Sequence, residues 1–246
     1  MYRSSIVPLI ALMAMSAPAL AEPTPVTVRV ISADAKFVGD TMGGARVTLR
    51  DASTGRLVAR GVTEGTTGDT DLIMKATGRS PVRASDGAAA YSVTLDIDRP
   101  TLVNLEVEGP LSRPGSIIKV SSQRWLMPGE AVTSGNGWMV ELPGLAITPE
   151  VSVSDDRLEI AAKVELMCGC PITPGGLWDA ADYRVTASLW QGNRQVEEAD
   201  LEFVSSPGNY RGALPVSRRG KHRLILFARN LETGNTGMTE IKVGPR

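Results

Sequence analysis

Apolar and polar side chains alternate in short runs along most of this chain, and this period of two is the pattern of β-strands that bury one face. In the first such run, Val26, Val28 and Val30 alternate with Thr27 and Arg29. The pattern predicts further strands at 46–50, 56–63, 91–97, 102–107, 116–121 and 137–142. A series of short strands at this spacing is typical of an antiparallel β-sandwich.

The strand pattern restarts after a break rich in proline and glycine, between Pro143 and Pro149. The second series of predicted strands covers 151–153, 158–166, 183–190, 201–204, 210–214, 222–228 and 239–243. The chain of 246 residues also exceeds the roughly 100–150 residues of a typical domain. We therefore expect an all-β protein of two tandem Ig-like or transthyretin-like antiparallel β-sandwiches, over residues 22–146 and 147–246.

The first 21 residues have the features of a secretory signal peptide. Arg3 is followed by an apolar segment over 6–15 and by the small-x-small sequence Ala19-Leu20-Ala21, at which signal peptidase cleaves. No later run approaches the ~20 apolar residues of a membrane-spanning helix. We expect cleavage after residue 21 and a mature periplasmic protein without a membrane span.

The charge balance excludes some classes of partner. The 26 Lys and Arg residues nearly equal the 27 Asp and Glu residues, and no long run has one sign. Nucleic acids and anionic membranes are usually bound by clustered basic residues. A nucleic-acid partner is therefore not expected.

The segment from Glu64 to Ala90 interrupts the alternation. It contains four glycines and few large apolar residues, and a short helix is predicted around 69–76. Segments of this length without strands are usually functional loops or disordered. Both interpretations, a binding loop and a flexible crossover between sheets, stay open.

Two stretches carry a resemblance to known families. Residues 44–63, two strands joined by the turn Asp51-Ala52-Ser53-Thr54-Gly55, resemble the transthyretin-like and carboxypeptidase-regulatory-like sandwiches. Residues 208–214 and 220–230 resemble the closing strands of the FixH/YtkA-like periplasmic β-sandwiches. Both resemblances imply a sandwich fold. The resemblance to the FixH/YtkA-like family also implies a role in accompanying copper delivery or oxidase assembly, as in some members of that family.

The only two cysteines, Cys168 and Cys170, are separated by one glycine at the end of a predicted strand. Residues two apart on an extended strand lie about 6.5–7 Å apart, the outer limit for a disulfide, and Gly169 can shorten this distance by taking a positive φ. A disulfide across so few residues closes almost no loop and so stabilises the fold little. Stability alone is therefore a poor explanation for the pair.

Three interpretations of the cysteines remain. They can form a structural bridge that fixes the loop 171–182. They can bind a soft metal, for which Cu(I) is preferred, with Met167 as a third ligand, because paired thiolates and a thioether suit Cu(I) and a closed zinc site would lack ligands. They can also take part in thiol–disulfide exchange, although the C-x-x-C spacing and helix of thioredoxin-like enzymes are absent.

With one histidine, His222, the sequence shows no catalytic constellation, and no cofactor other than Cu(I) is expected. The working hypothesis is a non-enzymatic periplasmic accessory protein that binds or delivers Cu(I) through Cys168 and Cys170, with a cuproenzyme or assembly factor as its partner. The alternative is a structural or adaptor protein that docks onto a secreted partner, with a Cys168–Cys170 loop disulfide. A thiol–disulfide exchange factor is the second alternative.

Overall fold

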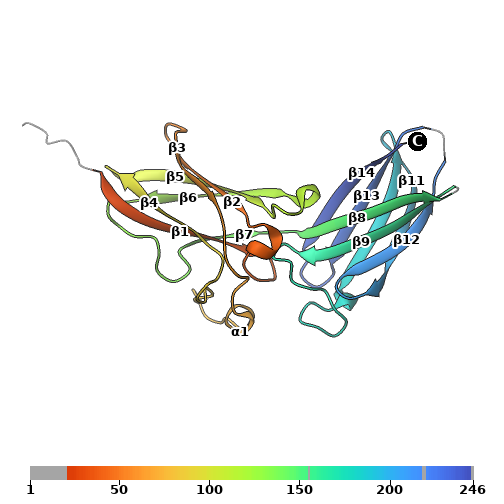
Figure 1. Cartoon of the computed structure of the whole chain (residues 1–246), viewed down its shortest axis with the longest axis horizontal. Helices are drawn as coiled ribbons and strands as arrows, with labels where there is room; N and C mark the ends of the chain where they lie inside the picture. Colours follow the sequence, from red (N-terminus) through yellow and green to blue (C-terminus); the bar gives the residue numbers. More distant parts are fainter. Residues whose placement is uncertain (1–20, 155, 218–219, 245–246) are drawn as a thin grey trace, which may run out of the picture.

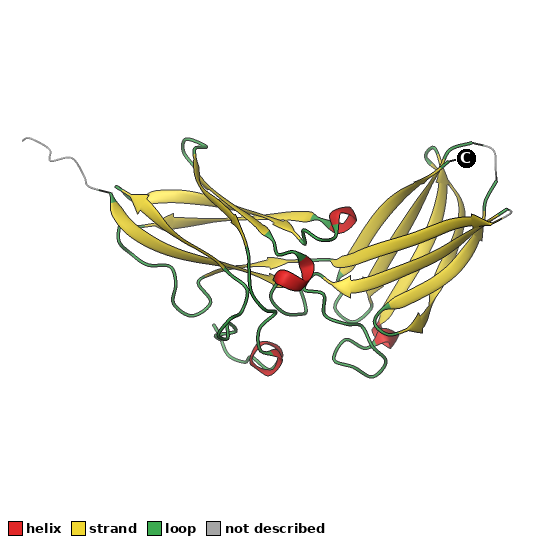
Figure 2. Ribbon diagram, in the orientation of Figure 1, coloured by secondary structure: helices red, strands yellow, loops and turns green. Residues whose placement is uncertain are grey.

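The computed structural model describes residues 21–154, 156–217 and 220–244. The chain is nearly all β and forms two lobes side by side (Figures 1 and 2). We call residues 22–142 the N-terminal lobe and residues 145–243 the C-terminal lobe. The predicted signal peptide lies outside the described residues, except for its last position. No helix in these ranges is long and apolar enough to cross a membrane.

The N-terminal lobe contains strands β1 (Glu22–Ser32), β2 (Arg46–Asp51), β3 (Leu57–Val62), β4 (Tyr91–Ile97), β5 (Thr101–Gly109), β6 (Ile118–Leu126) and β7 (Trp138–Leu142), the helix α1 (Thr70–Met74), and the 3-10 turns η1 (Asp40–Met42) and η2 (Pro114–Ser116). The C-terminal lobe contains strands β8 (Leu145–Ser154), β9 (Arg157–Leu166), β10 (Tyr183–Gln191), β11 (Arg194–Ser205), β12 (Asn209–Pro215), β13 (His222–Asn230) and β14 (Thr236–Val243), and the 3-10 turn η3 (Ala180–Asp182).

The N-terminal lobe is a sandwich of two sheets, with strand orders β4-β1-β7 and β3-β2-β5-β6. Its core is formed by the inward residues of the predicted alternation, such as Val26, Val28 and Val30 of β1, which are at most 1% exposed. The expectation of purely antiparallel sheets is wrong at one place, because β1 and β7 pair in parallel. Alternation does not distinguish the two pairings, since both put successive side chains on opposite faces.

The segment 64–90 packs on the lobe instead of extending into solvent. The predicted helix is confirmed as α1, and the Asp69 carboxylate caps it by accepting a hydrogen bond from Leu72 N at 2.7 Å. Ile73 of this helix and Ala88 and Ala89 form a small apolar cluster with Phe37 and with Ile31 of β1. The segment therefore covers the outer face of β1.

The C-terminal lobe is built from one continuous sheet, in the order β14-β13-β10-β11-β12-β9-β8. The sheet folds over on itself around a single core, and Gly237 of the edge strand β14 packs directly on the backbone of Leu145 in the other edge strand, β8. β8 begins two residues before the predicted domain start at 147. β11 is longer than its predicted range of 201–204. The apolar pattern did not reveal the rest of this strand, because many of its side chains are exposed and polar.

Candidate functional site

The two cysteines lie in a tight turn that follows β9. Gly169 N donates a hydrogen bond to Leu166 O at 2.8 Å, and Gly169 has a φ of +78°, a conformation that glycine adopts without a Cβ penalty. Cys168 and Cys170 are joined in a disulfide, and their Cα atoms are 5.5 Å apart. This distance is shorter than an extended strand would allow, as the positive φ of Gly169 predicts.

The disulfide is buried. Cys168 is 0% and Cys170 4% exposed, and both belong to the core of the C-terminal lobe. Met167 is also buried, but it belongs to the core of the N-terminal lobe and its methyl end contacts Gly144. The structure thus brings the cysteines together and places the thioether of Met167 in the other lobe's core.

The N-terminal lobe closes over the cysteine turn through η1. Thr41 Oγ1 donates a hydrogen bond to Cys168 O at 3.3 Å. Met42 packs against Gly169 so closely that a Cβ at position 169 would lie 3.0 Å from the Met42 sulfur. The turn is therefore part of the contact between the lobes, which we call the lobe junction.

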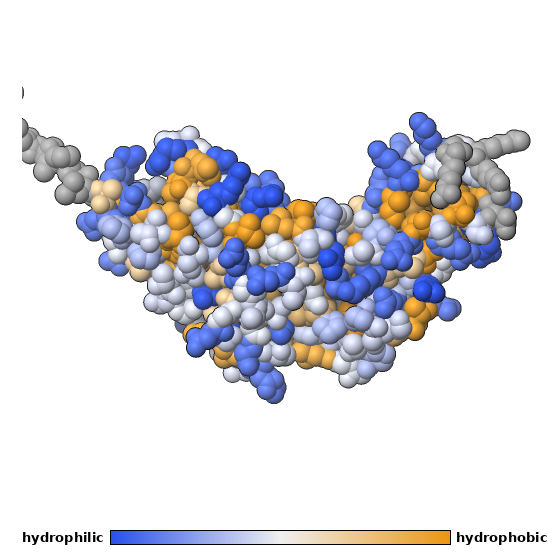
Figure 3. Space-filling view, viewed as in Figure 1, coloured by the Kyte–Doolittle hydropathy of each residue, from blue (hydrophilic) through white to orange (hydrophobic). Residues whose placement is uncertain are grey.

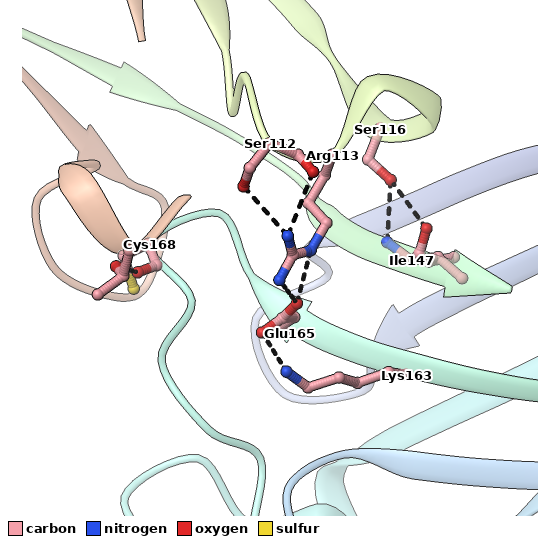
Figure 4. Close-up of polar contacts among 8 residues, drawn as sticks. Ser112, Arg113, Ser116, Ile147, Lys163, Glu165 and Cys168 are labelled. Carbon is pink, nitrogen blue, oxygen red and sulfur yellow. Dashed lines mark hydrogen bonds and ion pairs between the residues drawn. The ribbon is translucent and has the colours of Figure 1, made fainter. Parts of the chain in front are cut away.

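An ion pair with a buried carboxylate connects the two lobes at the lobe junction (Figure 4). Arg113, from the loop before η2, donates from Nε and Nη2 to Oε2 of Glu165 on β9, at 2.9 and 2.8 Å. Lys163 Nζ reaches the other carboxylate oxygen at 2.8 Å. The Glu165 side chain is only 5% exposed, so both cations are needed to compensate its lost hydration.

Neutral hydrogen bonds complete the lobe junction. The Ser116 hydroxyl of η2 accepts from Ile147 N at 2.9 Å and donates to Ile147 O at 3.4 Å, and so satisfies the open edge of β8 (Figure 4). The Asn235 side chain pairs with both backbone groups of Gly144, at 2.8 and 3.1 Å. Trp178 Nε1 donates to Asp34 O at 2.8 Å.

A groove of about 760 Å³ runs along the lobe junction, lined by both lobes. Exposed apolar side chains flank it, with Ile117 (40% exposed) on one side and Phe227 (39%) and Met238 (53%) on the other. Figure 3 shows apolar surface on the concave side of the molecule, where the two lobes meet. Asp34 and Glu141 also line this groove.

Two buried tyrosines titrate outside their ordinary range. Burial raises the pKa of Tyr183, and the carboxylates of Asp34 and Asp182 add to this effect. Burial raises the pKa of Tyr210 to about 12. Both phenols are therefore neutral at physiological pH and behave as core residues.

Within the described part of the chain, no three His, Cys, Asp or Glu side chains gather as a metal-binding group.

Sequence reasoning identified the cysteine turn but missed the groups around it. Thr41 and Cys168 are 127 positions apart, and Arg113 and Glu165 are 52 apart. No local motif signals such contacts. The one available signal was Glu165 in an otherwise apolar strand end, since a buried carboxylate requires a cationic partner.

No protein-family model and no curated protein matches this chain. Among solved structures, a DUF3823 family protein from Bacteroides ovatus is similar at 12% identity and a TM-score of 0.35, with 91% of this chain and 100% of that chain covered. A putative carbohydrate binding protein from Bacteroides uniformis is similar at 8% identity and a TM-score of 0.29, with coverage of 91% and 100%. The chicken interferon gamma receptor alpha chain is similar at 11% identity and a TM-score of 0.36, with coverage of 92% and 99%. TM-scores this low assign neither a family nor a function, and the β-sandwich fold rests on the strands and sheets described above.

Proposed function

We propose that this protein is a non-enzymatic periplasmic adaptor whose two lobes are held at a fixed angle to receive a secreted partner protein. The observation that carries the proposal is the construction of the lobe junction. Neighbouring domains usually move relative to each other unless their interface is large and well packed. Here a buried ion pair, a buried disulfide turn and hydrogen bonds from several elements fix the contact.

The groove along the junction supplies the surface for the partner. Exposed apolar side chains with a polar rim are typical of protein–protein contact sites. Ile117, Phe227 and Met238 come from both lobes, so the groove keeps its shape only while the lobes stay in place. In this proposal the Cys168–Cys170 disulfide shapes the turn that seats one lobe on the other.

A photo-crosslinking experiment in the cells that produce the protein tests this function. A photoreactive amino acid at position 117 or 238 should give a discrete crosslinked protein, and Phe227→Asp should remove it. The same probe at Val204, an exposed apolar residue in the C-terminal lobe outside the groove, serves as the control. Equal crosslinking from position 204, or none from 117 and 238, would contradict the proposal.

Cu(I) binding is a second candidate, and one observation favours it. The sulfur of Met42 lies against Gly169, which is the residue between the two cysteines in the sequence. If the disulfide were reduced, two thiolates and a thioether would therefore lie close together. The resemblance of residues 208–214 and 220–230 to FixH/YtkA-like sandwiches agrees with this candidate. The disulfide and the burial of both cysteines oppose it, because metal transfer would require reduction and an opening of the junction. Thiol–disulfide exchange meets the same obstacle.

An anaerobic Cu(I) titration of the reduced protein against a chromogenic chelator separates these candidates. Copper binding predicts a one-to-one complex that is lost in Cys168→Ser and in Cys170→Ser. If Met42 supplies the third ligand, Met42→Leu weakens the complex and Met167→Leu does not. The adaptor proposal predicts no competition with the chelator.

A further inference from the structure

Trp125 differs from the other three tryptophans of the chain. The indole N–H groups of Trp138, Trp178 and Trp190 all donate hydrogen bonds to protein oxygens, at 3.3, 2.8 and 2.9 Å. Trp125 is 64% exposed, and its indole N–H donates to no described residue. An aromatic ring left in water forgoes the large gain that burial of its surface would bring. The exposure of Trp125 therefore requires an explanation.

Trp125 lies on the outer face of the sheet β3-β2-β5-β6, near the end of the edge strand β6. Its neighbour Leu126 belongs to the core of the lobe, so the ring of Trp125 points outward. Leu102 of β5 lies directly opposite Trp125, and the next pair on this face is Asn104 with Gln123. Neighbouring positions on one face of a sheet are about 5–7 Å apart. The register thus places the ring and the two amide side chains in one surface patch.

The two amides of this patch are held together and are open to solvent. Gln123 Nε2 donates to Asn104 Oδ1 at 2.7 Å. The remaining Gln123 oxygen and Asn104 nitrogen bond to no described residue, and Gln123 is exposed and Asn104 partly exposed. One acceptor and two N–H donors therefore face solvent beside the ring. Exchanging the oxygen and nitrogen in both amides would leave the same provision.

The charges beside the patch are compensated. Lys119 Nζ lies 3.0 Å from a carboxylate oxygen of Glu106 and 3.2 Å from one of Glu108. The outer faces of β5 and β6, both strands being described in full, carry no cation besides Lys119. Arg50 of the neighbouring strand β2 donates from Nη1 to Gly55 O at 3.1 Å. Nucleic acids also stack on aromatic rings, but they require a groove of unpaired cations. The patch therefore suits an uncharged ligand.

We propose that Trp125, Gln123 and Asn104 form a shallow binding site for one sugar ring of a neutral hexose polysaccharide. The C–H face of a pyranose ring packs on the face of an indole, which carries partial negative charge, and the hydroxyl groups at its rim pair with amide donors and acceptors.

The site lies away from the lobe junction. Ile118, at the start of β6, lines the junction groove, and Trp125 lies seven residues further along the strand, roughly 23 Å away (Figure 1). The proposal therefore does not rest on the adaptor function, and a partner in the groove would leave the sugar site open.

NMR titration of the oxidised protein tests the site. Cellohexaose, maltohexaose and mannohexaose are added separately, and the indole N–H signals of the four tryptophans are recorded, with Trp125→Phe to assign the signal of Trp125. We expect a saturable shift of this signal with at least one of the three sugars, while the signals of Trp138, Trp178 and Trp190 stay in place.

Variants assign the binding to the patch, and their affinities are measured from the backbone amide signals of β5 and β6. Trp125→Ala should weaken binding about tenfold or more. Gln123→Ala should weaken it about two- to tenfold, since it removes hydrogen bonds between neutral groups. Leu177→Ala, which changes an exposed apolar side chain of the C-terminal lobe, should leave the affinity unchanged.

Two results would overturn the proposal. One is the absence of a saturable shift of the Trp125 signal with all three sugars. The other is equal affinity in Trp125→Ala, Gln123→Ala and the unchanged protein, which would place the sugar elsewhere. If Trp125→Ala does not fold, the titration of the unchanged protein and the Gln123→Ala comparison still decide the question.

Discussion

Removal of Arg113 tests the lobe junction most sharply. In Arg113→Met, the carboxylate of Glu165 keeps Lys163 but loses two hydrogen bonds, of 2.9 and 2.8 Å, while its side chain stays 5% exposed. Breaking a fully buried pair by removing one partner costs about 3–5 kcal/mol. The Arg113 side chain is 26% exposed, which screens part of the interaction, so we expect a loss of about 2–4 kcal/mol in the free energy of unfolding.

The double variant Arg113→Met/Glu165→Met separates the pair from its surroundings. It removes the buried charge together with its partner, and Lys163, whose side chain is 37% exposed, turns to solvent. Replacing both members of a buried pair by apolar residues of similar size is often nearly neutral. We expect the double variant to be more stable than Arg113→Met, with a coupling energy of about 1–3 kcal/mol.

Equilibrium unfolding of the oxidised protein in urea, with both lobes followed separately by NMR, measures these changes. Arg46→Met is the matched control, because the Arg46–Glu108 pair has a similar length of 2.9 Å but side chains that are 44% and 27% exposed. Its loss should cost about 1 kcal/mol or less. A loss of stability in Arg113→Met no larger than that in Arg46→Met would refute the role of the Arg113–Glu165 pair. A double variant less stable than Arg113→Met would refute it as well.

Three further predictions concern single features. Gly169→Ala should lower the free energy of unfolding by about 2–3 kcal/mol, because a Cβ at a φ of +78° is strained and lies 3.0 Å from Met42 atoms. The control Gly55→Ala, at a φ of +71° in open space, should lower it by about 1 kcal/mol. Equal losses for the two variants in urea unfolding would contradict this prediction. Hydrogen bonds from Ser53 and Thr54 lower the pKa of Asp51 from 3.8 to about 2, so the ionised carboxylate stabilises the fold fully above about pH 4 and loses this effect as the pH falls towards 2. Asp51→Asn should therefore flatten the dependence of the free energy of unfolding on pH between about 4 and 2. An unchanged dependence would refute the role of these hydrogen bonds. The Cys168–Cys170 disulfide should react with a phosphine reductant far more slowly in the native protein than in urea, because both cysteines are at most 4% exposed. Titration of the released thiols measures the two rates. Equal rates would contradict the burial of the disulfide.

The fold follows from the sequence where local patterns decide it. The alternation in residues 91–97 predicts β4 at its observed bounds, and the helix predicted around 69–76 appears as α1. The turn 51–55 is likewise local, since the Asp51 carboxylate accepts its hydrogen bonds from Ser53 and Thr54. Pairing between distant strands is not local. The parallel contact of β1 with β7 and the continuous sheet of the C-terminal lobe depend on long-range packing. This packing does not change the alternation of apolar and polar residues within a strand, so the sequence pattern does not reveal it.

The candidate site shows the same division. Met167 directly precedes Cys168 in the sequence, but its side chain lies in the core of the N-terminal lobe. The approach of Met42 to Gly169 could not be read from the sequence, because it depends on how the lobes dock.

Residual dipolar couplings test the central claim, that the lobe junction holds the two lobes at a fixed angle. They are measured for backbone amides of both lobes in the oxidised protein under weak alignment. A rigid junction predicts that one alignment tensor fits β1–β7 and β8–β14 together, and that Arg113→Met loosens this agreement. Separate tensors of different magnitude for the two lobes of the unchanged protein would show that the lobes move independently, and would contradict the account.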